Sequence, residues 1–172
     1  MGQRLNIEIC NNKKTLANCY YHWGGYTLSS LELTEKIINY FNENKVLPNE
    51  KGAIELLEAT GASYPGKDRS AGLIDVDPKK MEQTRKWEEG RITINIEKNT
   101  FDFKCAFEKD YIDDEEIWNI IQHKFYKIHL DTNFQCEIQF SKIEDFIKGV
   151  EIAQNKYGGR FQFGFHCYIS IF

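Results

Sequence analysis

The stretch that decides the fold class is RLNIEICNNKKTLANCYYH, residues 4–22. Arg4–Cys10 alternates apolar and polar residues, so it is predicted as a strand with its aliphatic side chains on one face. The polar residues 11–13 are typical of a turn, and Thr15–His22 is predicted as the antiparallel partner strand. The chain therefore opens with a β-hairpin.

After this hairpin, segments with the apolar spacing of helices alternate along the sequence with segments that are predicted as further hairpins. Ser29 or Ser30 is predicted to cap the first helix. The predicted helices are Ser29–Asn44, Glu50–Thr60, Lys79–Glu89 (or a charged turn), Asp113–His123 and Ser141–Tyr157. Short strand signals occur at Leu73–Val76, Arg91–Glu97, Phe101–Phe107, Phe125–Leu130, Phe134–Phe140 and Arg160–Phe172. Because hairpins outnumber crossover units, we expect an α+β fold, with a mainly antiparallel sheet packed by about four helices.

The length of 172 residues favours a single compact domain, 1–172, with a subdivision near residue 90 as the alternative. The net charge of −4 argues against a dedicated nucleic-acid-binding module. Aromatic residues make up 14% of the chain, which argues against disorder. No apolar run reaches the ~20 residues of a membrane span, and no signal peptide is evident, so we expect a cytoplasmic protein without membrane contact.

The cysteines are odd in number and scattered, which favours free thiols in a reducing compartment over a disulfide framework. They are Cys10, Cys19, Cys105, Cys136 and Cys167. Two Cys/His pairs, Cys19 with His22 and His166 with Cys167, have spacings that suggest zinc. Residues one or three apart on a strand point to opposite faces, so neither pair is expected to converge. We predict no metal and no cofactor.

The segment YYHWGGY, residues 20–26, is the first candidate site, because it follows a strand and precedes a helix. Its rings can stack on a ligand, its glycines allow close approach, and His22 can act as an acid or a base. The alternative is a strand-to-helix corner filled by aromatic rings. The predicted ligand-binding residues here are Tyr21, His22, Trp23, Gly24, Gly25 and Tyr26.

The irregular stretch 61–78 is the second candidate, because it is longer than most connections. Lys67, Asp68 and Arg69 lie in it between glycines, where cationic side chains and backbone N–H groups can hold an anion. The Gly-Lys-Ser/Thr ending of a phosphate-binding loop is missing, and a structural loop is the alternative.

The segment 108–116 is the third candidate, with six acids and one lysine in nine residues. Such a surface can imitate phosphates or dock against a basic partner. Favourable charge at a helix N-terminus is the alternative, and the spacing of a calcium loop is missing. The predicted partner-binding residues are Asp110, Asp113, Asp114, Glu115 and Glu116.

Three motifs together resemble a family of small bacteriophage and prophage proteins: Met-Gly-x-Arg at residues 1–4, the segment 21–26, and Tyr-x-x-x-Asp-Arg at residues 64–69. The resemblance covers roughly residues 1–75. It implies an accessory role in infection, including opposition to host defence. Gly24 stands where the family usually has Asp, and Thr27 where it has Pro, which disfavours enzyme chemistry.

Two functions follow as hypotheses. The first is a phage or mobile-element protein that binds and inhibits a host defence component, such as a CRISPR effector, its partner being a basic protein or ribonucleoprotein. The second is a nucleotide- or RNA-binding protein or phosphodiester-cleaving enzyme. There His22 would be the acid or base, Tyr21 and Trp23 would stack a base, and Lys67 and Arg69 would hold phosphate. A structural or assembly protein is the plain alternative, and the Phe-rich strand at 161–172 is either core or a homodimer interface.

Overall fold

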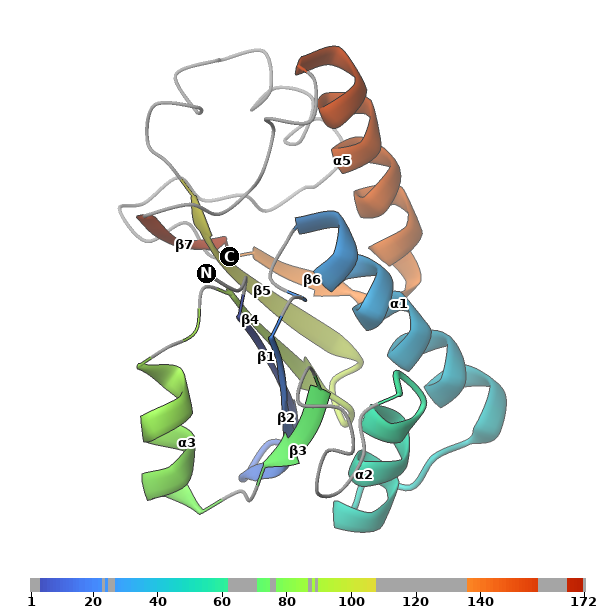
Figure 1. Cartoon of the computed structure of the whole chain (residues 1–172). Coiled ribbons are helices and arrows are strands. Elements are labelled where there is room, and N and C mark those ends of the chain that lie inside the picture. The colour runs from blue at the N-terminus through green and yellow to red at the C-terminus, as the bar shows by residue number, and fades with distance from the viewer. Residues whose placement is uncertain are drawn as a thin grey trace.

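The computed structural model describes residues 4–22, 24, 27–61, 71–74, 77–86, 88, 90–107, 136–157 and 167–171. The fold is α+β, and Figure 1 shows helices on both sides of one sheet. The strands are β1 (Leu5–Cys10), β2 (Thr15–Tyr21), β3 (Ala71–Ile74), β4 (Gly90–Asn95), β5 (Thr100–Phe107), β6 (Cys136–Gln139) and β7 (Cys167–Ile171). The helices in this part of the chain are α1 (Thr27–Asn44), α2 (Glu50–Glu58), α3 (Pro78–Arg85) and α5 (Ile143–Tyr157), with a 3₁₀ turn, η2, at Phe140–Lys142.

The sheet is mainly antiparallel, as expected, since all of its described pairings but one are antiparallel. The exception is one parallel pairing, so the sheet is mixed and is not built from hairpins alone. The strand order is β3-β2-β1-β4-β5-β6, and β7 also pairs with β5. β1 and β2 form the predicted hairpin, but the other neighbour of β1 is β4, which runs parallel to it. β2, α1, α2, β3 and α3 lie between β1 and β4 in the chain. This long connection allows β4 to run parallel to β1, whereas the short turn of a hairpin joins only antiparallel strands.

The hairpin of β4 and β5 confirms the prediction around Lys98 and Asn99. Its turn has Asn99 at φ 55°, in the left-handed region that Asn tolerates better than most residues. The strand predicted at 125–130 and the helix predicted at 113–123 lie outside the described residues. The division into one or two domains stays a prediction.

Three helix starts differ from the sequence-based boundaries. α1 begins at Thr27 rather than at Ser29 or Ser30, and Ser30 is buried inside the helix, where its carbonyl accepts a hydrogen bond from Thr34 Oγ1. Ser141 lies in η2, and α5 begins after it. α3 starts at Pro78, because the side chain of Asp77 caps it and proline suits the first helical position.

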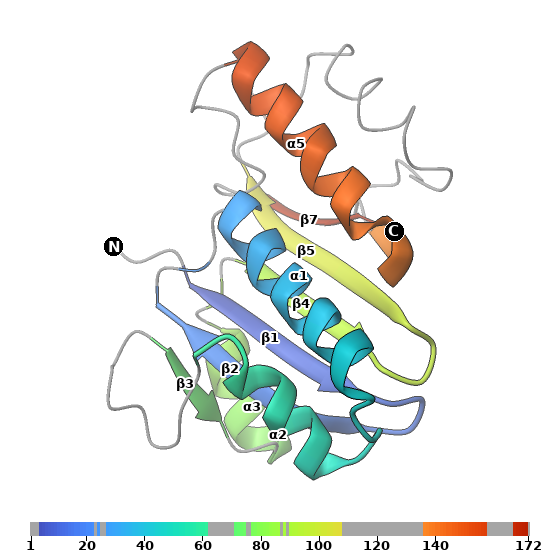
Figure 2. The ribbon, with the colours of Figure 1, turned by 90° about the vertical axis from the view of Figure 1, so that its right-hand side faces the viewer.

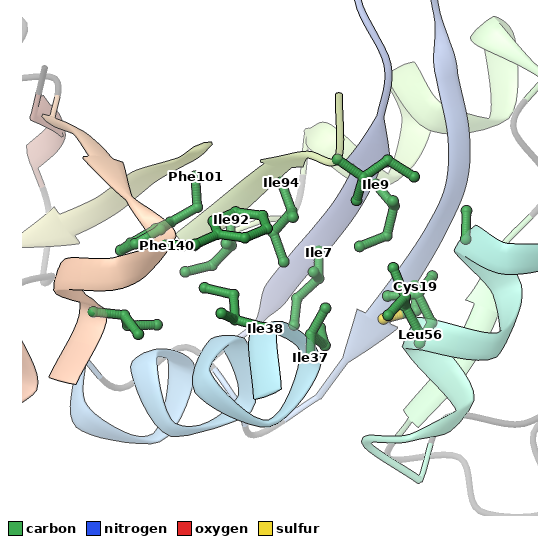
Figure 3. Packing of buried hydrophobic residues seen from close by; sticks show 14 of the residues in the cluster. Ile7, Ile9, Cys19, Ile37, Ile38, Leu56, Ile92, Ile94, Phe101 and Phe140 are labelled. Carbon is green, nitrogen blue, oxygen red and sulfur yellow. The ribbon is translucent and has the colours of Figure 1, made fainter. Parts of the chain in front are cut away.

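The hydrophobic core lies on one face of the sheet. Leu5, Ile7 and Ile9 of β1 are fully buried and point toward the helices, as their alternation predicts. Figure 3 shows the side chains of Ile37 and Ile38 from α1 meeting the aliphatic residues of the sheet. Figure 2 shows α1, α2 and α5 together on this side, and α1 contacts both of the other two. This core-facing side is called the apolar face below.

α3 lies on the opposite side of the sheet from α1 and α2 (Figures 1 and 2). Met81 is its buried residue. The sheet therefore has helices against both of its faces, although the two faces differ in composition. Among the described residues, no helix is long and apolar enough to cross a bilayer.

Candidate functional site

The segment 21–26 contributes to packing where it is described. Tyr21 is buried in the core, and its hydroxyl donates to Thr60 Oγ1, which itself donates to the carbonyl of Leu57. Burial, and second the charge of Cys19, raise the pKa of Tyr21 above its usual value. Gly24 is buried too, and a Cβ added there would lie 2.9 Å from the Cβ of Tyr21 and 3.2 Å from Leu5 Cδ2. The absence of a side chain at Gly24 thus lets the chain pass close to Leu5, the first residue of β1.

His22 lies just beyond β2, and its ring is half-buried. Its Nδ1 lies 3.0 Å from the hydroxyl of Tyr20, and the two rings are tilted against each other with centroids 6.3 Å apart. Tyr20 alternates with the buried Tyr21, so it lies on the sheet face opposite the core. The hydrogen bond therefore turns the imidazole toward that second face.

The remaining predicted site residues lie outside the described part of the chain. These are Trp23, Gly25, Tyr26, Lys67, Asp68, Arg69, Asp110, Asp113, Asp114, Glu115 and Glu116. Their ligand-binding and partner-binding roles stay predictions. Of the predicted set, Tyr21, His22 and Gly24 meet at one corner, with Tyr21 facing the core and His22 bonded to Tyr20.

The sheet face opposite the core carries a further candidate site, which lies outside the segments predicted from the sequence. The pairing register places Asn18 of β2 opposite Glu8 of β1, Glu8 beside Thr93 of β4, and Thr93 opposite Asp102 of β5. Residues paired in this way share one face of a sheet. A neighbouring row places Tyr20 opposite Asn6 and Asn6 beside Arg91. This surface is called the polar face below.

The polar face is buried at its centre, although its residues are polar. Asn6 is 0% exposed, Asn18 1% and Glu8 3%. Burying a polar group costs free energy unless hydrogen bonds within the protein replace those that it made with water. The bonds formed by these side chains therefore decide what this face can do.

Two carboxylates and two guanidinium groups form a connected network there. Arg85, in the last turn of α3, donates from Nε to Glu8 Oε1 at 3.0 Å and from Nη2 to Glu8 Oε2 at 2.9 Å. Arg91 of β4 donates to both carboxylate oxygens of Glu88, from Nε at 3.1 Å. The Nε of Arg91 also lies 3.7 Å from Glu8 Oε1, which joins the two pairs. Asn6 Nδ2 donates to Glu88 Oε2 at 2.6 Å.

Asn18 and Asn6 still have buried polar atoms that find no hydrogen-bond partner in the described part of the chain. These atoms are Nδ2 and Oδ1 of Asn18, and Oδ1 of Asn6. Most buried polar groups in folded proteins are hydrogen-bonded, so such atoms call for an explanation. The polar face therefore offers one further hydrogen-bond donor and two further acceptors beside a buried carboxylate.

A sequence signal for this face exists. In LNIEIC, Asn6 and Glu8 alternate with the aliphatic residues, and Asn18 and Tyr20 alternate in the same way in β2. An alternating strand usually turns its polar side to water. The alternation therefore indicates which residues share the face, but not that another element covers it.

The two described thiols, Cys10 and Cys19, are free and lie on opposite faces. Cys19 is fully buried in the core, and burial raises the pKa of its thiol from 9.0 to about 12. Cys10 is partly exposed, and burial, then the charge of Glu8, raises the pKa of its thiol to about 11. Both thiols are therefore protonated at neutral pH and unreactive as nucleophiles.

Within the described ranges, no group of three or more His, Cys, Asp or Glu side chains is placed to hold a metal ion. An open surface hollow of about 390 Å³ lies between the β1–β2 turn and the start of α2. The exposed ion pair of Lys14 and Glu50, at 2.6 Å, stands at this hollow. Its lining residues are Asn11, Lys14, Leu16, Pro48, Asn49, Glu50 and Lys51.

Comparison of the chain with family models, with curated proteins and with solved structures finds no match.

Proposed function

We propose that this chain is a phage or mobile-element accessory protein that acts in the host cytoplasm, where it binds and inhibits a component of a host defence system. The partner is a basic protein or a ribonucleoprotein, such as a CRISPR effector. The proposal builds on the resemblance of residues 1–75 to phage proteins and on the acidic segment 108–116. It is a proposal of binding and not of catalysis.

The observation that supports binding over catalysis is the position of Tyr21 and Gly24. Tyr21 is 7% exposed and hydrogen-bonded to Thr60, while Gly24 packs against Tyr21 and Leu5. A ring that stacks on a ligand must present a face to it, and the ring of Tyr21 is buried in the core instead.

The experiment measures whether the chain protects a phage from an active CRISPR system, in a bacterial strain whose CRISPR system targets that phage. Protection here means a higher efficiency of plaquing. Expression of the chain is expected to raise the efficiency of plaquing by at least about tenfold, because a blocked effector no longer cleaves incoming DNA. The test variant reverses four acids of segment 108–116, and the protection is expected to be lost. Its substitutions are Asp113→Lys, Asp114→Lys, Glu115→Lys and Glu116→Lys.

The matched control carries the same change of net charge at four exposed helical acids elsewhere. Its substitutions are Glu43→Lys, Glu58→Lys, Glu82→Lys and Glu151→Lys. Protection by the control and not by the test variant supports the acidic segment as the interface. No protection by the unmodified chain, in strains with each of several defence systems, would overturn the proposal.

The contact of Tyr20 with His22 favours a second candidate, the nucleotide- or RNA-binding protein or phosphodiester-cleaving enzyme. A hydrogen bond to Nδ1 fixes the orientation of an imidazole, as acid–base catalysis requires. Turnover of RNA or a cyclic nucleotide, lost in His22→Ala and reduced in Tyr20→Phe, would favour this candidate. No turnover and no thermal shift with either ligand would rule it out.

A further inference from the structure

The two partners of the Glu8–Arg85 ion pair differ in their surroundings. The side chain of Glu8 is 4% exposed and belongs to the middle of the sheet, whereas that of Arg85 is 38% exposed and comes from α3. The carboxylate is therefore a fixed part of the polar face. The guanidinium group reaches it from a surface helix, in the bidentate geometry that recognises carboxylates.

α3 is held to the sheet by few apolar contacts. It has eight residues, and Met81 is its buried residue. Segments with little buried apolar surface open at a small fraction of the cost of global unfolding. Opening of α3 would uncover polar side chains, so it would not expose a large apolar surface to water.

The closed arrangement leaves hydrogen-bonding capacity unused beside Glu8. Asn18 lies opposite Glu8 in the register and is 1% exposed, and its amide nitrogen and oxygen have no partner among the described residues. Asn6 Oδ1 is a further buried acceptor without a partner. An asparagine amide with a free donor and a free acceptor can bind both groups of a peptide bond.

We propose that the polar face is a docking site for an arginine in an extended basic segment of the partner, and that Arg85 occupies the guanidinium position when no partner is bound. The incoming guanidinium makes the two hydrogen bonds to Glu8 that Arg85 makes in the closed state. The peptide backbone next to it pairs with the amide of Asn18. A phosphate would instead face the carboxylate of Glu8, so the site favours a basic peptide over a nucleic acid. This inference rests on the proposed function, since it names how that partner is recognised.

The test measures binding of the peptide Gly-Arg-Gly-Arg-Gly, acetylated and amidated at its ends, by titration calorimetry. Arg85→Gln removes the internal competitor, so peptide affinity is expected to rise by about tenfold or more. Lys86→Gln removes the same charge from the neighbouring exposed residue and is expected to leave affinity unchanged. Gly-Lys-Gly-Lys-Gly is expected to bind more weakly, because an ammonium group cannot make the bidentate contact.

A second variant tests the role of Asn18 apart from the fold. Asn18→Leu in the Arg85→Gln background replaces the buried amide by an apolar side chain of similar size. The melting temperature is expected to be maintained, while peptide affinity falls by about tenfold, since a lost hydrogen bond between buried groups is worth roughly that factor. A polyanion, single-stranded DNA of twenty nucleotides, is expected not to compete for the site.

Equal peptide affinity in the unmodified chain and in Arg85→Gln would overturn the docking site, as would equal gains in Arg85→Gln and Lys86→Gln. Competition by the DNA would assign the face to a nucleic acid and overturn it as well. If the chain protects the phage but Arg85→Gln does not raise peptide affinity above that of the unmodified chain, this inference fails and the proposed function stands. If the peptide binds as expected and protection is absent, the proposed function fails.

Discussion

The two faces of the central sheet bury their side chains by different physical means. On the apolar face, Ile7 and Ile92 are held by the packing of α1, α2 and α5, and many aliphatic side chains share the stabilisation. On the polar face, Glu8 and Asn6 are equally removed from water, but Glu8 depends on two hydrogen bonds from Arg85 and Asn6 on one to Glu88. Apolar burial tolerates exchange of one hydrocarbon for another of similar volume, whereas a buried ion pair does not tolerate loss of either partner.

This difference separates stability from specificity within one sheet. The apolar face supplies the free energy of folding, because hydrocarbon buried there gains from leaving water regardless of orientation. We expect the polar face to contribute specificity instead, because a buried charge is stabilised only by partners placed within hydrogen-bond distance.

The largest effect is expected on the apolar face. Phe101 is fully buried, so Phe101→Ala should lower the free energy of unfolding by about 3–5 kcal/mol, from lost transfer energy and the cavity left behind. Denaturant unfolding followed by circular dichroism measures it. Leu47→Ala is the control, because Leu47 is 66% exposed, and its effect should stay within about 0.5 kcal/mol. Similar losses in both variants would contradict the assignment of the core.

A smaller effect is expected on the polar face, from Glu8→Gln. The substitution leaves the guanidinium of Arg85 opposite a neutral amide, while Arg91 keeps its contact with Glu88, and it should cost about 2–3 kcal/mol. This value is below that for a fully buried pair, because Arg85 is partly exposed. Arg85→Gln in the same chain should recover part of the loss. A double-mutant cycle in denaturant measures this coupling, and additive losses would show that the two residues do not stabilise each other.

The smallest effect is expected from alkaline pH, and it compares one thiol from each face. Since burial raises the pKa of Cys19 from 9.0 to about 12, the thiol stays protonated in the folded chain while the unfolded chain ionises from about pH 9. Its contribution to stability is complete below pH 9 and is lost as the pH rises toward 12. Each such group lowers stability by up to about 1.4 kcal/mol per pH unit.

Unfolding free energies measured at pH 8, 9 and 10 test this expectation. Cys19→Ala should flatten the pH dependence, because it removes the group with the larger rise in pKa. Cys10→Ser should flatten it by a similar amount over this range, because a thiol with a pKa of about 11 is also still protonated at pH 10. An unchanged slope in Cys19→Ala would show that the thiol does not contribute.

The elements of this fold could be predicted from local patterns, and their partners only in part. Alternation defined β1 and β2, and the β4–β5 hairpin followed from the turn around Asn99. Both depend on interactions between residues close in the chain. The parallel pairing of β1 with β4 depends on how α1, α2 and α3 pack, which no local pattern records.

The candidate sites divide in the same way. A glycine-rich aromatic corner was visible in the sequence, but the buried position of Tyr21 follows from the packing of Leu5 and Thr60 around it. The polar residues of β1 were visible too, yet alternation alone predicts that they face water. The carboxylate of Glu8 is instead buried with a bidentate contact to Arg85, which lies 77 positions away in the chain.

The parallel contact of β1 with β4 also has a consequence for how the chain reaches its fold. The β1–β2 hairpin and the β4–β5 hairpin can each form from contacts between residues close in the chain. The pairing of Leu5 with Gly90 instead closes a long loop. Closing such a loop costs chain entropy before any contact repays it, and folding slows as contacts become less local. We therefore expect the two hairpins to form before they meet, and the pairing of β1 with β4 to slow folding relative to a chain with local contacts alone.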